Sequence, residues 1–195
     1  ESRGLGDVYK RQVKDVNDLA KILHLAFEVA TTGRPGPVLV DVPKDVQFAS
    51  GLYTKKNETY KSFVEKEPSI DLNMLDEAIN RLELAERPII YSGGGVINSG
   101  QSAVNSLRNL VAGTNFPITS TLMGLGSYPA SGKNWLGMLG MHGTYEANMS
   151  MHDCDFMLCI GARFDDRITG RIDAFSPNSY KVQLDIDPSS INKNI

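Results

Sequence analysis

Short apolar runs of strand length alternate in this chain with segments of helical periodicity, and glycine or proline stands at most of the junctions. The strand-like runs are residues 38–42, 89–91, 117–120, 156–160 and 182–186. In most of the intervening segments, apolar residues recur every three or four positions, as on one face of a helix. Strands that alternate with helices pair in parallel, so the pattern predicts an α/β fold with a parallel sheet and helices on both faces. We expect that sheet to be incomplete at the C-terminus, near the start of a further helix.

Interruptions of this alternation divide the chain into four parts. Residues 1–12 show no apolar periodicity, and we interpret them as a non-matching or disordered N-terminus. Residues 13–47 hold one helix and one strand, which are too few for a domain and are interpreted as the end of an earlier one. Residues 48–70 are rich in Lys, Glu and Ser, as surface linkers are. Residues 71–195 carry the remaining strands and helices and form a second domain.

Charge and cysteine usage exclude several kinds of function. The formal net charge is −3 and the sequence pI is about 5.6, which argues against nucleic acid as a partner. No uninterrupted apolar run reaches the roughly 20 residues of a membrane helix, so no membrane partner is expected. Cys154 and Cys159 lie in a predicted strand, where their odd spacing directs the side chains to opposite faces. We therefore expect two buried thiols rather than a disulfide or a metal site.

Four segments rich in glycine or polar residues follow successive predicted strands. They are residues 93–95, 121–124, 161–165 and 185–187. In an open parallel sheet, ligands bind beyond the carboxyl ends of the strands, so one nucleotide-like ligand can contact all four segments. The three glycines at 93–95 would let a backbone approach a pyrophosphate. A plain tight turn explains them equally well, because their spacing is not that of the dinucleotide fingerprint.

Three side chains in this region each have two interpretations. Arg163 could pair with a phosphate, but a surface ion pair with Asp165 or Asp166 is the simpler explanation. Asp185 could accept hydrogen bonds from ribose hydroxyls or cap a helix. His142 could present a ring nitrogen to a ligand or form a hydrogen bond within its own loop. The residues alone thus predict an α/β domain that binds a nucleotide-like ligand, with no metal site and no catalytic group.

Six longer motifs together resemble the large subunit of acetohydroxyacid synthase (acetolactate synthase). They are Thr-Gly-Arg-Pro-Gly-Pro-Val at 32–38, Val-Pro-Lys-Asp-Val-Gln at 42–47, Tyr-Ser-Gly-Gly-Gly at 91–95, Ser-Thr-Leu-Met-Gly-Leu-Gly at 120–126, Leu-Gly-Met-His-Gly-Thr at 139–144 and Gly-Ala-Arg-Phe-Asp-Asp-Arg at 161–167. The resemblance extends from about residue 13 to the end, and the last two motifs are the most specific.

The resemblance implies a three-domain transferase of branched-chain amino-acid biosynthesis, the pathway to isoleucine and valine. Such an enzyme decarboxylates pyruvate and joins it to a second pyruvate or to 2-ketobutyrate. Thiamine diphosphate and Mg²⁺ supply the chemistry, and their sites are expected outside this chain, so the isolated chain is expected to be inactive. Residues 13–47 would end the pyrimidine-binding domain, and residues 71–195 would be a truncated middle domain that binds FAD. The family further implies 2-keto acid substrates, a homodimer with a possible regulatory small subunit, and a bacterial cytoplasmic or plastid location.

The resemblance also implies which residues contact the cofactor and the substrate. The expected FAD contacts are Arg34, Gly94, Thr121, Leu122, Leu139, Gly140, Met141, His142, Gly161, Ala162, Arg163, Phe164, Asp165, Asp185 and Ile186. Lys44, Met141, Asp166 and Arg167 are expected in the substrate and inhibitor channel, where Arg167 would attract the anionic keto acid. No catalytic residue and no metal ligand is expected within the chain.

Two other assignments remain open. The chain could be the middle domain of another FAD-carrying thiamine enzyme, such as glyoxylate carboligase or pyruvate oxidase, although Phe-Asp-Asp-Arg at 164–167 favours the synthase. It could also be a stand-alone nucleotide-binding module, perhaps for NAD. The helix and strand within 13–42 argue against a module, because a free module has no reason to keep half of a neighbouring sheet.

Overall fold

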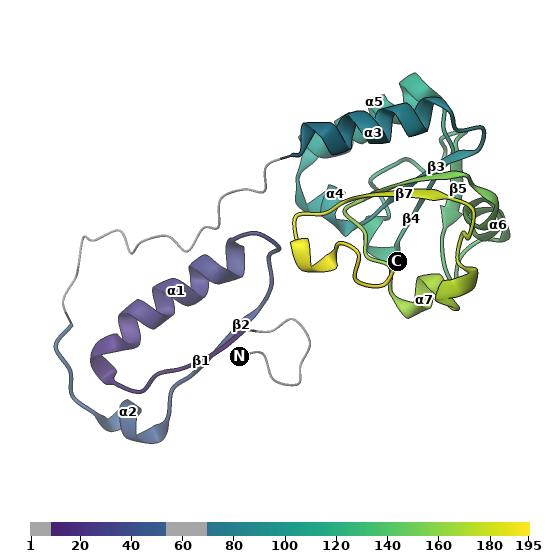
Figure 1. Cartoon of the computed structure of the whole chain (residues 1–195). Helices are drawn as coiled ribbons and strands as arrows, with labels where there is room; N and C mark the ends of the chain where they lie inside the picture. Colours follow the sequence, from purple (N-terminus) through teal and green to yellow (C-terminus); the bar gives the residue numbers. More distant parts are fainter. Residues whose placement is uncertain (1–8, 54–69) are drawn as a thin grey trace. The chain divides into compact units, whose positions relative to one another are not determined.

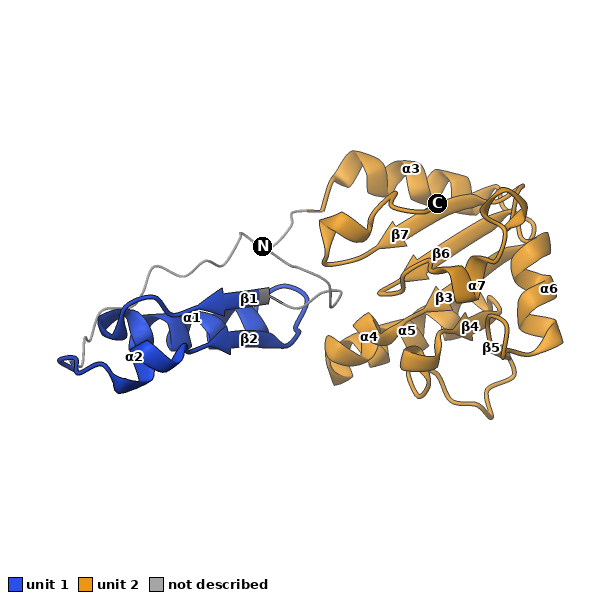
Figure 2. Cartoon of the chain, turned by 90° about the horizontal axis from the view of Figure 1, so that it is seen from below, with its two compact units in different colours: residues 1–69 blue, residues 70–195 orange. Residues whose placement is uncertain are grey.

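The computed structural model describes residues 9–53 and 70–195, which belong to two compact units, residues 1–69 and residues 70–195 (Figures 1 and 2). Residues 1–8 of the predicted N-terminal segment and residues 54–69 of the predicted linker lie outside the described residues. None of the described helices is long and apolar enough to span a membrane.

The first unit is a single β–α–β arrangement. Strands β1 (Tyr9–Gln12) and β2 (Val38–Asp41) pair in parallel. Helix α1 (Leu19–Thr31) connects them after a 3₁₀ turn at Val16–Asp18. A short helix, α2 (Lys44–Phe48), follows β2.

Strand β1 lies in the segment for which the sequence predicts no element. Its residues pair in register with β2, from Tyr9 opposite Val38 to Gln12 opposite Asp41. The side chains from Lys10 to Gln12 are exposed, so no apolar alternation reveals the strand. The backbone ladder holds it instead, together with a hydrogen bond of 3.2 Å from Gln12 Nε2 to Asp41 Oδ2. Disorder, one of the two interpretations of the N-terminal segment, is therefore wrong for residues 9–12.

The second unit is a five-stranded parallel sheet flanked by helices. Its strands are β3 (Pro88–Ser92), β4 (Ile118–Ser120), β5 (Trp135–Met138), β6 (Phe156–Ile160) and β7 (Tyr180–Leu184). Its helices are α3 (Leu72–Glu83), α4 (Gly94–Asn98), α5 (Gln101–Thr114), α6 (Tyr145–Asp153) and α7 (Asp166–Thr169). The spatial order of the strands is β5-β4-β3-β6-β7, and every pairing is parallel. The predicted α/β fold with a parallel sheet is confirmed.

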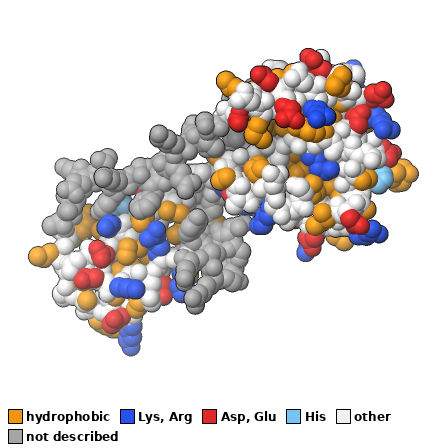
Figure 3. Space-filling view, in the orientation of Figure 1, with side chains coloured by type: hydrophobic (Ala, Val, Ile, Leu, Met, Phe, Trp, Pro, Cys, Tyr) orange, Lys and Arg blue, Asp and Glu red, His pale blue; other side chains and the backbone are white. Residues whose placement is uncertain are grey.

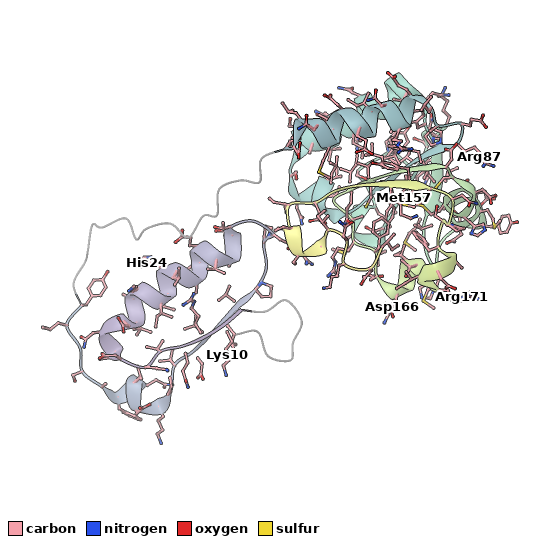
Figure 4. All side chains as sticks on the ribbon, in the orientation of Figure 1. Lys10, His24, Arg87, Met157, Asp166 and Arg171 are labelled. Atoms are coloured by element: carbon pink, nitrogen blue, oxygen red, sulfur yellow. The ribbon has the colours of Figure 1, made fainter. Side chains whose placement is uncertain are left out.

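Apolar side chains cover both faces of this sheet, because successive residues of a strand point to opposite sides. On one face, Ile90 of β3 packs in a cluster with Leu107 of α5. On the other face, Ile89 packs in a cluster with Met157 of β6 and Met151 of α6. Figure 1 shows α3 and α5 on the same side of the sheet, and Figure 4 shows Met157 in the interior of the unit.

Three parts of the second unit differ from the sequence prediction. Residues 123–142, where the sequence indicates no strand, contain β5, an edge strand whose register with β4 shifts between Ile118 and Ser120. Gly137 within β5 has a φ of +93°, which is atypical of a strand. A glycine at this position also weakens the sequence pattern that would indicate a strand. Strand β7 begins at Tyr180 rather than at residue 182. Pro188–Ser190 form a 3₁₀ turn where the sequence predicts the start of a helix.

Both cysteines are free and buried, as the sequence predicts, but their placement differs from the prediction. Strand β6 begins at Phe156, so Cys154 precedes the strand and the alternation rule does not apply to it. Both thiols lie in the same apolar cluster, with Cys154 Sγ 3.2 Å from Ser176 Oγ and Cys159 Sγ 3.3 Å from Ala162 O. The expectation of opposite faces is wrong. Burial raises the pKa of both thiols, that of Cys159 to about 12.

Asp155 connects the amino end of β6 to the turn that precedes β3. Its carboxylate accepts hydrogen bonds from Glu86 N at 2.7 Å and Arg87 N at 2.9 Å. Burial by itself would raise the pKa of Asp155, but the two backbone donors favour the charged form and hold the pKa below its ordinary value of 3.8. These two hydrogen bonds join residues that are far apart in the sequence. They lie at the edge of the sheet where the strands begin, opposite the candidate site.

Candidate functional site

The order in which strands are added to the sheet reverses between β3 and β6. Strands β4 and β5 lie on one side of β3, whereas β6 and β7 lie on its other side. Ser92, which ends β3, is the Cα partner of Ile160, which ends β6, so the two following loops start side by side. In open parallel sheets, the crevice at such a reversal is where ligands bind. The sequence prediction of a site at the carboxyl ends of the strands therefore matches the topology.

The loops that follow β3 and β6 touch each other backbone to backbone. Gly93 N donates to Ile160 O, and Gly95 N donates to Gly161 O, both at 2.9 Å. A Cβ on Gly93 would lie 2.1 Å from Gly161 O, and one on Gly161 would lie 2.7 Å from Gly95 Cα. Gly161 also has a φ of +61°, which favours glycine. The glycine run therefore starts α4 and lets two loops meet, instead of forming the plain tight turn that was its alternative interpretation.

The loop after β4 joins the same group. Thr121 N donates to Ser92 O at 3.0 Å, which fixes this loop to the end of β3. Thr121 Oγ1 accepts a hydrogen bond of 3.0 Å from Gly124 N and caps the 3₁₀ turn Leu122–Gly124. The side chain of Leu122 is 66% exposed and so faces solvent beside the glycine loops.

The loop after β5 contains four of the predicted FAD contacts, residues 139–142. Leu139 is 2% exposed and belongs to the core, whereas Met141 is 71% exposed and His142 is also exposed. Met141 N donates to Arg167 O at 3.2 Å, so this loop lies against the start of α7. The backbone and the outward side chains of the loop, rather than the Leu139 side chain, are available to a ligand.

The segment that follows Gly161 alternates between the core and the surface. Ala162 and Phe164 are buried, and the ring of Phe164 packs 5.9 Å from that of Tyr91 between centroids. Arg163 and Asp165 are exposed. A ligand at this segment could meet the side chains of Arg163 and Asp165, but only the backbone of Ala162 and Phe164.

The remaining predicted residues of this unit lie on α7 and after β7. Asp166 and Arg167 are exposed in the single turn of α7, and Figure 4 shows Asp166 at the surface. Asp185 is partly buried, and its Oδ1 accepts a hydrogen bond of 2.9 Å from Asp187 N. The cap of the following 3₁₀ turn is Asp187, so the alternative interpretation of Asp185 as a helix cap is wrong. Ile186 is 52% exposed.

A cavity of about 130 Å³ opens beside the ends of β6 and β7. Arg163, Asp165 and Lys193 contribute charged groups to its lining, and Gln183 and Phe164 line it as well. Sites that enclose small molecules are usually several times larger, on the order of 300 Å³ or more. The cavity is therefore too small to enclose a dinucleotide.

Arg34 and Lys44 belong to the first unit, whereas the other predicted site residues belong to the second. Arg34 lies in the turn between α1 and β2. Lys44 is the first residue of α2, and its Nζ lies 5.8 Å from the centroid of the Phe48 ring. The carboxyl edge of the sheet brings together the predicted site residues of the second unit.

Two residues that the sequence does not indicate as site residues contact the loops of this edge, Tyr91 through the Phe164 ring and Asn148 through Gly140. Tyr91 is fully buried, and its hydroxyl has no hydrogen-bond partner among the described residues. Burial raises the pKa of Tyr91 above its ordinary value of 10.0, so the hydroxyl stays neutral. Asn148 of α6 bonds to the backbone of Gly140. A tyrosine in an apolar run and an asparagine in a helix carry no signal of such contacts in the sequence.

Charge on the visible surface is mixed. Figure 3 shows Lys and Arg side chains interspersed with Asp and Glu on the face of the second unit turned to the viewer. That face therefore resembles a general protein surface rather than a nucleic-acid interface, which needs a concentrated positive field.

The strand order and the helices beside the sheet define the class of this unit, a doubly wound α/β domain. Comparison with known proteins then identifies the family. The family model described as thiamine pyrophosphate enzyme, central domain, matches residues 75–195, which is more than half of the chain. The chain belongs to this family.

The individual relatives are acetolactate synthases. The chain is 44% identical over 181 residues to the acetolactate synthase isozyme 2 large subunit of Escherichia coli (strain K12). It is 43% identical over 185 residues to the acetolactate synthase large subunit of Haemophilus influenzae and 44% identical over 186 residues to the probable chloroplastic acetolactate synthase 2 of Oryza sativa subsp. japonica. These matches confirm the resemblance seen in the sequence motifs and favour it over the two alternatives.

The alignments cover nearly all of this chain but a minor part of each relative. They span 93%, 94% and 93% of the chain, and 32%, 32% and 27% of the three relatives in the same order. The chain thus spans about a third of the length of the curated relatives it matches.

Proposed function

We propose that this chain is part of the catalytic large subunit of an acetolactate synthase and that its second unit binds FAD. The observation that carries the proposal is the meeting of the strand-end loops at one edge of the sheet, because one extended ligand can contact all of them. The identity to acetolactate synthase large subunits supports the enzyme assignment.

The chemistry of the residues at this edge fits a flavin dinucleotide. Such a ligand has a charged pyrophosphate, hydroxylated sugar groups and apolar planar rings. Arg163 is an exposed cation suited to a phosphate, and Asp185 has a second carboxylate oxygen besides the one that accepts from Asp187 N. Leu122 and Met141 are 66% and 71% exposed and offer apolar surface to a ring system. Bound here, FAD would have a structural role without net redox turnover.

The whole enzyme would decarboxylate pyruvate and join it to a second pyruvate or to 2-ketobutyrate. We assign Lys44, Met141, Asp166 and Arg167 to the channel through which these keto acids pass. Arg167 would draw the anionic substrate toward the channel by its charge. The hydrogen bond from Met141 N to Arg167 O would hold the loop after β5 and the start of α7 together at this position.

Further features follow from the same assignment and are proposed with it. Thiamine diphosphate and Mg²⁺ would supply the carbon–carbon bond chemistry from parts of the enzyme other than these residues. The enzyme would be a homodimer that can associate with a regulatory small subunit. Because the relatives come from bacteria and chloroplasts, we place it in the bacterial cytoplasm or in plastids.

The test is a titration of the chain with FAD, in which quenching of flavin fluorescence reports binding. NAD and FMN are then added as competitors. Arg163→Ala should weaken FAD binding about tenfold, since it removes one charged hydrogen bond to a phosphate. Arg87→Ala is the matched control, because it also removes one guanidinium from the second unit but lies well apart from Asp166 of α7 (Figure 4). Saturable FAD binding that only Arg163→Ala weakens supports the proposal. Binding of NAD in preference to FAD, or no nucleotide binding, would refute it.

A further inference from the structure

Asn148 holds the backbone of the loop after β5 through three hydrogen bonds. Its Oδ1 accepts from Gly140 N at 3.2 Å, and its Nδ2 donates to Gly140 O at 3.0 Å and to Thr144 O at 2.8 Å. The side-chain amide therefore uses its acceptor and both of its donors on this loop. An aspartate has no donor, and an alanine has neither donor nor acceptor, so only an amide of this length makes all three contacts.

The conformation of Gly140 requires such support. Its φ is +106°, which favours glycine, and a Cβ there would lie 2.9 Å from Ile168 Cδ1 and 3.0 Å from Arg167 O. Glycine is also the residue with the most conformational freedom to lose on folding. Gly143 N donates to Gly140 O at 2.9 Å, so the oxygen that Asn148 binds also closes the turn.

Two further backbone hydrogen bonds fix the loop to other elements, and two of its side chains face solvent. Leu139 N donates to Ser120 O at 3.0 Å, and Met141 N donates to Arg167 O at 3.2 Å. The side chains of Met141 and His142 are exposed. A loop with a fixed backbone and outward side chains has little conformational entropy left to lose when it binds a ligand.

We propose that Asn148 is a positioning residue that pre-organises residues 139–142 for FAD. This inference rests on the proposed FAD function of the second unit. Asn148 contacts the loop backbone rather than the ligand, so it acts through Gly140 and the residues that follow it. Its contribution is a conformation of the loop that exists before the flavin arrives.

The experiment compares the chain with Asn148→Ala and Asn148→Asp variants, with Asn80→Ala on the exposed surface of α3 as the control. Amide hydrogen exchange, resolved by residue, is measured first without flavin. In Asn148→Ala, the amides of Gly140 and Gly143 should exchange about tenfold faster, while that of Leu139, bonded to Ser120 O, should keep its rate. FAD affinity and the visible absorption spectrum of the bound flavin are then measured on the same samples.

Asn148→Ala should weaken FAD about tenfold and make its spectrum more like that of free flavin, and Asn80→Ala should change neither. Asn148→Asp keeps the size of the side chain but turns a charge toward two carbonyl oxygens, so it should weaken FAD as well. It serves as the second probe if the alanine variant does not fold. Unchanged exchange at Gly140 would overturn the inference, and so would faster exchange with an unchanged FAD affinity. If the unmodified chain bound no FAD, the proposed function would fail, and the exchange rates would still decide whether Asn148 holds the loop.

Discussion

Replacement of Gly161 by alanine tests the close contact between the loops that follow β3 and β6. The added Cβ would lie 2.7 Å from Gly95 Cα and 2.9 Å from Val96 N, which are both backbone atoms and cannot rotate away. The backbone of residue 161 would also keep a φ of +61°, which L-residues rarely adopt. Both effects disfavour the folded state and leave the unfolded chain nearly unchanged.

The expected cost has three parts. The positive φ costs about 1 kcal/mol for a residue with a Cβ. The forced separation of two packed backbones costs about 2 kcal/mol, as overpacking of a core does. Weakening of the bond from Gly95 N to Gly161 O costs about 1 kcal/mol more. The total of about 4 kcal/mol is less than the stability of a typical domain, on the order of 10 kcal/mol, so the variant should still fold.

Urea unfolding measures this loss in the free energy of unfolding. Tryptophan fluorescence is a suitable readout, because the only tryptophan, Trp135, lies in β5 of the second unit. Gly113→Ala is the matched control, since Gly113 lies in α5 with no atom within 4 Å of an added Cβ. That control should stabilise the unit by about 0.5 kcal/mol through helix propensity. A loss of less than about 1 kcal/mol for Gly161→Ala would refute the backbone contact between the two loops.

Three further perturbations test other parts of the second unit. Tyr91→Phe removes a buried hydroxyl without a described partner, so it should stabilise the unit by about 1 kcal/mol in thermal unfolding, and a loss of stability would contradict its burial. Folding lowers the pKa of Asp155, so its carboxylate stabilises the unit above the ordinary pKa of 3.8, and this contribution disappears as the pH falls through the lower folded pKa. Asp155→Asn should therefore cost about 1–2 kcal/mol near neutral pH and flatten the acid dependence of stability, whereas Asp76→Asn on exposed α3 should do neither. Cys154 and Cys159 should resist thiol reagents in the native protein and react in urea, so rapid native labelling of either would show that it is accessible.

The central strands could be predicted from the sequence because both of their faces are buried. Strands β3 and β6 lie in the middle of the sheet and appear as nearly continuous apolar runs. Strand β5 is at an edge and contains Gly137, and β1 is a polar ladder on the surface, so neither produces an apolar run. Strands held mainly by backbone pairing leave little trace in the pattern of apolar side chains.

The location of the candidate site could also be predicted, since the carboxyl ends of parallel strands always meet at one edge. The assignment of single residues required the family motifs. The sequence did not distinguish the side chains of Ala162 and Phe164, which enter the core, from Arg163 between them, which does not. The bond between Asn148 and Gly140 could not be predicted, because it depends on how α6 packs against a loop whose course the sequence leaves open.

The most direct test of the account is to map FAD on the chain by residue-resolved amide chemical shifts. The account predicts that saturation with FAD perturbs amides at residues 93–95, 121–122, 139–142, 161–165 and 185–186, all at the carboxyl edge of the sheet. Amides at the opposite edge, such as those of Glu86 and Asp155, should be unaffected. Perturbations concentrated at that opposite edge, or none in the second unit at saturating FAD, would contradict the assignment of the site.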